Sequence, residues 1–134
     1  MEIFTTYPVL VVITSLLINE ILKVIFDTIK NRSFSLVNLF KTGGLPSGHA
    51  AFVASLIFSV GKIEGIDSVA FMIAVTFGII VIYDAGHLRA AAGQHAKALN
   101  LLKPNLKLEE RLGHQPFEVL VGVLVGVISA WFFL

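Results

Sequence analysis

The sequence predicts an all-α protein, an integral membrane helical bundle of about four transmembrane helices with one amphipathic helix at the interface. Two observations lead to this prediction. Hydrophobic residues make up 56% of the 134 residues and charged residues only 14%, whereas a soluble domain contains about 25% charged residues. The apolar residues also form long runs, and a transmembrane helix needs about 20 residues. The length fits a single domain, residues 1–134.

The first apolar run extends from Tyr7 to Phe26 and is long enough for one span. Asn19, Glu20 and Lys23 interrupt it near its end. Glu20 and Lys23 are three residues apart, so they share a helix face and can form an ion pair. Charges at membrane depth are candidates for function. The alternative is a neutralised pair close to the interface.

The second predicted helix begins at residues 43–49, a stretch that is small, polar and rich in glycine. Pro46 suits the first turn of a helix, and Ser47 can cap it. The helix from there to about Val60 is short, and its small residues predict close packing inside the bundle. Backbone N–H groups at its start favour an anion beside the imidazole of His49. A capped helix with an incidental histidine is the alternative.

Residues 68–83 are apolar and uncharged, which predicts a return across the bilayer. A polar cluster with Asp84, His87 and Arg89 follows. From His87 to Leu102, leucine and alanine recur at helical spacing, which predicts an amphipathic helix lying on the membrane surface. A charged loop then leads to the last span.

The last span opens at residues 113–118 and runs to Leu134, with Pro116 in its first turn. Gly122 and Gly126 form a GxxxG motif, which permits close contact between helices. This contact lies either within the protomer or between protomers. The second case predicts a homo-oligomer through this helix.

Four spans would bring the polar clusters to one membrane face. That face holds His49 and His114, and Glu118 lies four residues after His114, roughly one helical turn along. The candidate ligands for a phosphate group are basic residues that meet at the same face. They are Lys23, Lys30, Arg32, Arg89 and Arg111.

Two imidazoles, a carboxylate and several cations beside a helix N-terminus predict phosphoryl transfer. One histidine would attack phosphorus and the other would protonate the leaving alcohol, while the carboxylate fixes the tautomer of the nucleophile. This chemistry requires no metal and no cofactor. A zinc site is the rival use of the histidines, and the surrounding Lys and Arg side chains argue against it. The net charge of +1 implies no nucleic-acid partner.

The order of these motifs resembles the type 2 phosphatidic acid phosphatase and vanadium haloperoxidase superfamily. The stretch from Pro46 to His49 is similar to its second motif, and the stretch from Leu112 to Gly122 to its third. Nearly the whole chain resembles the divergent branch of that superfamily, a set of small membrane proteins. The resemblance thus implies one phosphatase-like membrane domain over residues 1–134.

The resemblance implies roles for the residues that match its motifs. His114 would be the phosphohistidine nucleophile and His49 the general acid, and Ser47 and Gly48 would bind phosphate. Glu118 stands where the superfamily usually has Asp, and it would orient His114.

Two motifs depart from the superfamily pattern. Lys23 and Lys30 have the spacing of the first motif, but Lys30 replaces its arginine, and Arg32 is a candidate substitute. The arginine of the third motif is absent from its usual place shortly before the histidine. Arg89 is the candidate for this role, with Arg111 as the alternative.

The function implied by the resemblance is a metal-independent membrane phosphatase, which hydrolyses a lipid phosphate monoester or diphosphate through a phosphohistidine. The alternative is a non-catalytic membrane protein of the same fold that binds anionic lipid headgroups. A binder should tolerate the loss of Lys23 and Arg89, and an enzyme should not. Asp84 is the next candidate to support His114 if Glu118 does not orient it.

The basic residues predict an orientation in the membrane. Basic residues concentrate in cytoplasmic loops, and nine of the ten Lys and Arg lie on or near the face of the histidines. When the candidate phosphate ligands are left out of this count, four lysines remain on the face of the histidines, and Lys62 alone lies on the other membrane face. The four are Lys41, Lys97, Lys103 and Lys107. The sequence therefore predicts a cell-membrane protein, surrounded by lipid, whose active site faces the cytoplasm.

Overall fold

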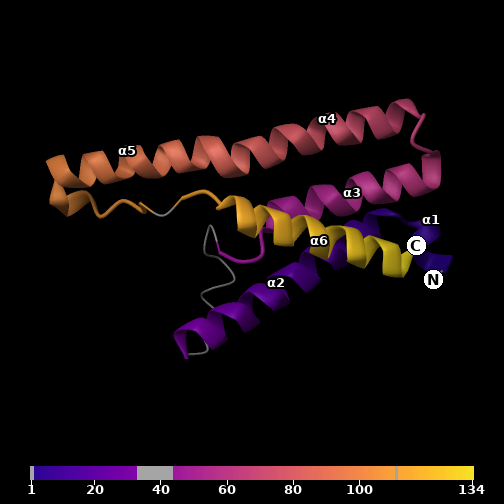
Figure 1. Cartoon of the computed structure of the whole chain (residues 1–134), viewed down its shortest axis with the longest axis horizontal. Helices are drawn as coiled ribbons and strands as arrows, with labels where there is room; N and C mark the ends of the chain where they lie inside the picture. The colour runs from indigo at the N-terminus through magenta and orange to yellow at the C-terminus, as the bar shows by residue number, and fades with distance from the viewer. Residues whose placement is uncertain (1, 33–43, 111) are drawn as a thin grey trace.

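The chain is all-helical in a computed structural model that describes residues 2–32, 44–110 and 112–134 (Figure 1). The predicted all-α class is confirmed. Two short segments are not α-helical: η2 (Asp84–Leu88) is a π-helical turn, and η3 (Pro104–Leu106) is a 3-10 turn. The elements in chain order are α1 (Glu2–Thr6), α2 (Val9–Asn31), α3 (Gly48–Glu64), α4 (Val69–Tyr83), η2 (Asp84–Leu88), α5 (Arg89–Leu102), η3 (Pro104–Leu106) and α6 (Pro116–Phe133).

The most extensive contact between the described helices is that of α3 with α6. Gly122 and Gly126 are buried on the face of α6 that meets α3. A Cβ atom at Gly122 would clash with the carbonyl oxygen of Ser47, and one at Gly126 with that of Ala51. The GxxxG motif therefore lets two backbones approach within one chain. A homo-oligomer through this helix stays a prediction, and it would need a different face of α6.

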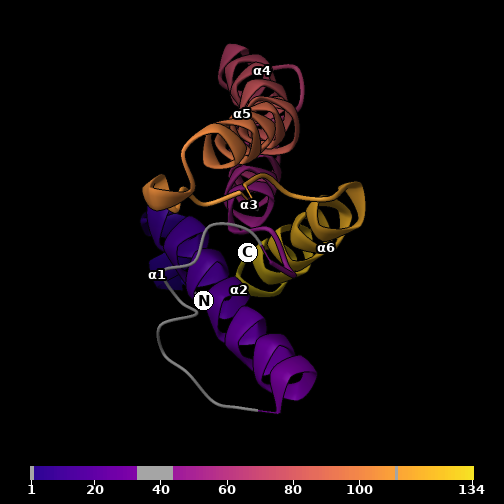
Figure 2. The same ribbon diagram turned by 90° about the vertical axis from the view of Figure 1, so that its left-hand side faces the viewer.

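The helix α2 packs against α3 and α6 with one buried stripe. The stripe consists of Val11, Val12, Ser15, Asn19 and Lys23. It changes from apolar to polar along the helix, so its polar end lies where α3 begins. Lys23 is the last buried residue of α2. The end of α2 diverges from the other helices (Figures 1 and 2).

The helix α4 packs mainly on α3, through Ala74 and Gly78. A Cβ atom at Gly78 would lie 2.6 Å from Cδ1 of Ile57. Most of the remaining surface of α4 is apolar and exposed. A helix that is apolar all round suits a lipid environment.

Within the described residues, three helical stretches are long and apolar enough to cross a membrane: α2, the rod from α4 to α5, and α6. The helix α3 has 17 residues. Small residues make up most of its buried surface, as the sequence predicts for a helix inside the bundle. They are Ala50, Ala51, Ala54, Ser55 and Ser59. The count of four spans stays a prediction.

The amphipathic segment is helical, as predicted, and it continues directly from α4, so its place on the membrane surface stays a prediction. Residues 69–102 form one continuous rod of 34 residues, because the π-helical turn η2 joins α4 to α5 without a break. Figure 2 views this rod nearly end-on, with α4 behind α5.

The returning chain covers part of the buried stripe of α5. Gly93 lies against the backbone of Glu110. The side chain of Asn100 forms hydrogen bonds with both the carbonyl and the N–H of Leu108. Asn100 Nδ2 donates to the Leu108 carbonyl at 2.8 Å, and Leu108 N–H donates to Asn100 Oδ1 at 2.9 Å. The segment after α5 therefore packs back along α5, as Figure 1 shows.

The contact between α3 and α6 predicts that one methyl group added on α6 at this contact strongly lowers the stability of the protein. Gly126→Ala places a Cβ against a backbone carbonyl that cannot swing aside, so we expect a loss of about 1–3 kcal/mol of stability. Chemical or thermal unfolding in detergent measures it. Gly86→Ala is the control, since nothing lies within 4 Å of that position. Equal stability of the two variants would contradict the assigned packing.

Candidate active site

Ser47 caps the N-terminus of α3, as the sequence predicts, but Pro46 precedes the cap and lies outside the first helical turn. Ser47 is the N-cap, and its hydroxyl accepts a hydrogen bond from the N–H of Ala50 at 3.4 Å. The N–H of Ser47 itself donates to the carbonyl of Glu118 at 3.0 Å. This backbone bond joins the start of α3 to the first turn of α6. The positive end of the α3 dipole therefore lies beside the residues that open α6.

His49 lies in the first turn of α3 and contacts Arg89. The guanidinium Nη2 of Arg89 donates to Nε2 of His49 at 3.2 Å. Because a guanidinium only donates, Nε2 of His49 has no proton in this arrangement. The same guanidinium pairs with Asp84, with 3.7 Å between Nε and Oδ2.

The π-helical turn explains the pairing of Asp84 with Arg89. These residues are five apart, and a regular α-helix would point them in different directions. In η2 the backbone N–H of Arg89 bonds to the carbonyl of Asp84, which is the i→i+5 pattern. Such turns occur often at functional sites. The sequence contains no signal for this turn, although it marks both residues as polar.

His114 lies just before α6 and is held from two sides. Its side chain is 5% exposed, and its Nδ1 lies 3.3 Å from Oε2 of Glu118. Its backbone N–H donates to the carbonyl of Ala85 at 3.0 Å. The preceding Gly113 has a φ of +87°, a conformation that favours glycine, and packs against Ala90.

Glu118 contacts His114 through a capping box and not along a shared helix face. The helix begins at Pro116, so His114 precedes it. Gln115 is the N-cap, and its backbone N–H donates to Oε2 of Glu118 at 3.0 Å. The same oxygen faces the imidazole. The predicted pair is present, and the capping box positions its carboxylate.

The two imidazoles face a shared space. Their ring centroids are 6.1 Å apart, and the planes are tilted by 59°. Because Nδ1 of His114 is turned to Glu118, its Nε2 is the nitrogen that remains for chemistry. The described part of the chain thus brings His49, His114, Glu118, Ser47 and Gly48 together.

Lys23 completes the positive charge of the site. Its side chain is only 8% exposed, and Nζ lies 3.4 Å from Oε2 of Glu20, the ion pair that the sequence predicts. Glu20 also reaches Gly48, where a Cβ would lie 2.9 Å from Oε1. The glycine of the second motif therefore leaves room for the carboxylate. Asn19 is a residue that sequence reasoning missed as part of the site: it is fully buried and donates to the carbonyl of Pro46 at 3.4 Å.

The electrostatic surroundings favour a neutral His114. Burial lowers the pKa of its imidazole, and the charges of Lys23 and Arg89 lower it further. The hydrogen bond and the charge of Glu118 raise the same pKa. The balance lies below the ordinary value, so His114 has a free lone pair at neutral pH.

Two of the predicted phosphate ligands do not join this cluster. Lys30 and Arg32 are exposed on the diverging end of α2 (Figure 1). Arg111 lies outside the described residues. His87 is exposed and stacks on Tyr83 at 4.4 Å. Across residues 2–32, 44–110 and 112–134, no three metal-ligating side chains come together.

Comparisons with known proteins agree with this architecture. A profile of a family described as the divergent PAP2 family matches residues 4–129. The chain is also similar to YuiD of Bacillus subtilis (strain 168), an uncharacterized membrane protein. The two are 31% identical over an alignment 158 positions long, which covers all of both chains. No solved structure matches the chain. The predicted resemblance is confirmed, and so is the membrane class.

The contact between His114 and Glu118 predicts the direction in which the pKa of His114 changes when the charge of Glu118 is removed. Glu118→Gln keeps the capping box, because Gln also serves at that position. It removes a charge that raises the pKa of His114, so we expect this pKa to fall further. NMR titration of the imidazole in detergent micelles measures it. Glu64→Gln, at the far end of α3, is the matched control and should leave the titration unchanged. A rise in the pKa of His114 would contradict the assigned contact.

Proposed function

The chain belongs to the divergent PAP2 family, and we propose that it is a membrane phosphatase that removes a phosphate group from a lipid through a phosphohistidine. One observation supports this most strongly. Two imidazoles lie 6.1 Å apart, one beside a carboxylate and the other beside a guanidinium, at the N-terminus of a helix. This is the set of groups that phosphoryl transfer requires.

The phosphate group binds at the start of α3. The N–H groups and dipole of that helix attract its oxygens, next to Ser47 and Gly48. Lys23 and Arg89 supply positive charge, and such charge stabilises the equatorial oxygens of a transferring phosphoryl group. These groups act without a metal ion.

His114 is the nucleophile in this proposal. With the proton of Nδ1 directed to Glu118, the lone pair of Nε2 attacks phosphorus. The N–P bond forms as the P–O bond to the lipid breaks. The departing alkoxide takes a proton from His49. In the second step His49 takes a proton from water, the water oxygen bonds to phosphorus, and the N–P bond breaks to release phosphate.

Arg89 links phosphate binding to the acid role of His49. In the ligand-free arrangement its guanidinium donates a hydrogen bond to Nε2 of His49. A phosphate oxygen is a stronger partner for a guanidinium than a neutral imidazole, because the bond is charge-assisted at both ends. Bound phosphate therefore draws Arg89 away and leaves Nε2 open to hold the proton that the leaving group needs.

The alternative function is a non-catalytic protein that binds anionic lipid headgroups at the same site. One observation favours it: Lys30 and Arg32 lie away from the histidines, so fewer cations surround the phosphate than the full first motif would bring. A binder needs charge and does not need two histidines in separate chemical roles.

Phosphate release separates these functions. Purified protein is given long-chain phosphatidic acid in the presence of a chelator, and free phosphate is measured. His114→Ala should abolish release, and His49→Ala should reduce it by about 10²–10⁴-fold. His95→Ala, an exposed residue of α5, is the control and should retain full activity. Phosphate trapped on His49 would reverse the two roles, and normal turnover by His114→Ala would exclude the mechanism.

We further propose that the site faces the cytoplasm of a cell-membrane protein. Lys97 and Lys103 lie on the side of the histidines, on α5 and just after it, and Lys62 lies in the last turn of α3 at the other end. Basic residues resist translocation, which favours the cytoplasm for the first group.

Single cysteines test this orientation, because the natural chain has none. In intact cells an impermeant thiol reagent should label Glu64→Cys and spare Lys103→Cys. Membrane disruption should expose both positions and serves as the control. Labelling of Lys103→Cys alone in intact cells would place the site outside.

A further inference from the structure

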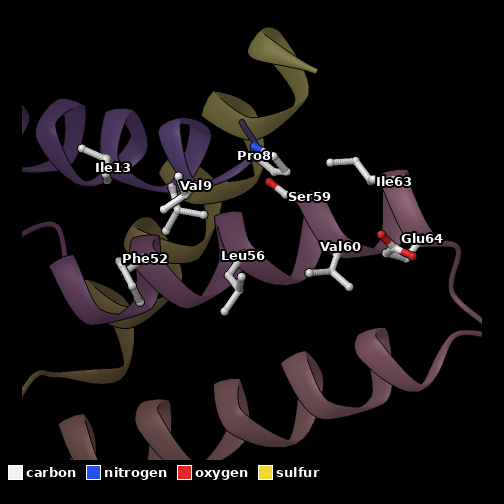
Figure 3. Close-up of a pocket in the computed structure, with 10 residues that line it drawn as sticks. Pro8, Val9, Ile13, Phe52, Leu56, Ser59, Val60, Ile63 and Glu64 are labelled. Atoms are coloured by element: carbon white, nitrogen blue, oxygen red, sulfur yellow. The ribbon is translucent and has the colours of Figure 1, made fainter. Parts of the chain in front are cut away.

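An apolar groove lies between the first turns of α2 and the length of α3. Its volume is about 280 Å³. On α3 it is lined by Phe52, Leu56, Val60 and Ile63, and on α2 by Val9 among others. Figure 3 shows Phe52, Leu56 and Val60 projecting from the same side of α3. The groove therefore has α3 as its floor.

The floor of the groove continues to the catalytic centre. His49, Phe52, Leu56 and Val60 follow one another at intervals of three or four residues, so they form one stripe along α3. The distance from His49 to Phe52 is about one helical turn, and from His49 to Ile63 it is about 21 Å at 1.5 Å per residue. The hydrocarbon core of a bilayer is about 30 Å thick. The stripe thus leads from the imidazole well into the depth of the hydrocarbon.

The two ends of the stripe differ in charge. Arg89 and Lys23 lie beside His49 at one end, and Glu64 lines the groove at the other. A phosphate group is attracted to the first end and repelled by the carboxylate of the second. The space between them is apolar. Lys62 lies in the same last turn of α3 as Glu64 but does not line the groove. The two cations beside His49 therefore favour an anionic lipid with its phosphate at His49 and its hydrocarbon towards Glu64.

From this geometry we infer that the groove between α2 and α3 binds the hydrocarbon tail of the lipid phosphate whose headgroup reaches His49 and His114. This inference rests on the proposed phosphatase function and adds the tail site to it. The groove opens to the surrounding lipid, so the substrate enters sideways from the bilayer. Selectivity for long-chain over short-chain phosphate esters then comes from Phe52, Leu56 and Val60.

Filling the groove tests the inference. Leu56→Trp adds bulk on the floor, and Val60→Phe fills the same groove one turn further if the first variant does not fold. The measured quantity is the ratio of kcat/KM for dioleoyl phosphatidic acid to kcat/KM for p-nitrophenyl phosphate, which has no tail. We expect this ratio to fall about tenfold, the effect of losing contact with roughly two methylene groups. Leu124→Trp, on the exposed side of α6, should leave the ratio unchanged.

A second measurement separates this inference from the proposed function. If the wild-type protein hydrolyses neither substrate, the phosphatase proposal fails, and retention of dioleoyl phosphatidic acid is compared by native mass spectrometry. Weaker retention by Leu56→Trp than by Leu124→Trp then supports the groove on its own. An unchanged hydrolysis ratio, or equal retention by the two variants, overturns the tail site.

Discussion

The close approach of α3 and α6 is the contact on which the site depends. Gly122 and Gly126 remove the side chains that would hold the two backbones apart. The N–H of Ser47 then reaches the carbonyl of Glu118. This bond aligns the first turn of α3 with the first turn of α6, and each turn has a histidine at or beside it. Backbone contact positions the imidazoles more firmly than side-chain contact alone, because side chains retain rotamer freedom.

The rod formed by α4, η2 and α5 adds the third side of the site. Its π-helical turn directs Arg89 to His49 and presents the carbonyl of Ala85 to the backbone of His114. The chain after α5 returns along the rod and is held there by Asn100. The rod therefore sets the path by which the chain enters α6, and with it the place of His114. Its apolar part contacts few other residues, as is typical of a lipid-facing helix.

Much of the fold and the site was accessible to sequence reasoning. Long apolar runs predicted the helices, and Ser47 and Pro116 marked two helix starts that the structure confirms. The ion pair of Glu20 with Lys23 also followed from helical spacing. The pairing of His114 with Glu118 is present as predicted, but a capping box produces it and not a shared helix face. Spacing could not place Lys30 and Arg32, because it does not reveal that the end of α2 diverges from the bundle. It also missed Asn19, whose partner is a backbone carbonyl 27 residues away.

The sequence by itself determined the environment and the helix starts at Ser47 and Pro116, since both follow from local composition, period and capping chemistry. Only the tertiary structure decided the direction of α5 and the face used by the GxxxG motif. A helical stripe on α5 is equally compatible with lipid and with the returning chain, and two glycines pack equally well within a protomer or between protomers. Contacts distant in the sequence made both choices: the backbone of Glu110 covers Gly93, and α3 covers Gly122 and Gly126. Such choices depend on which surfaces meet, and a local pattern does not contain that information.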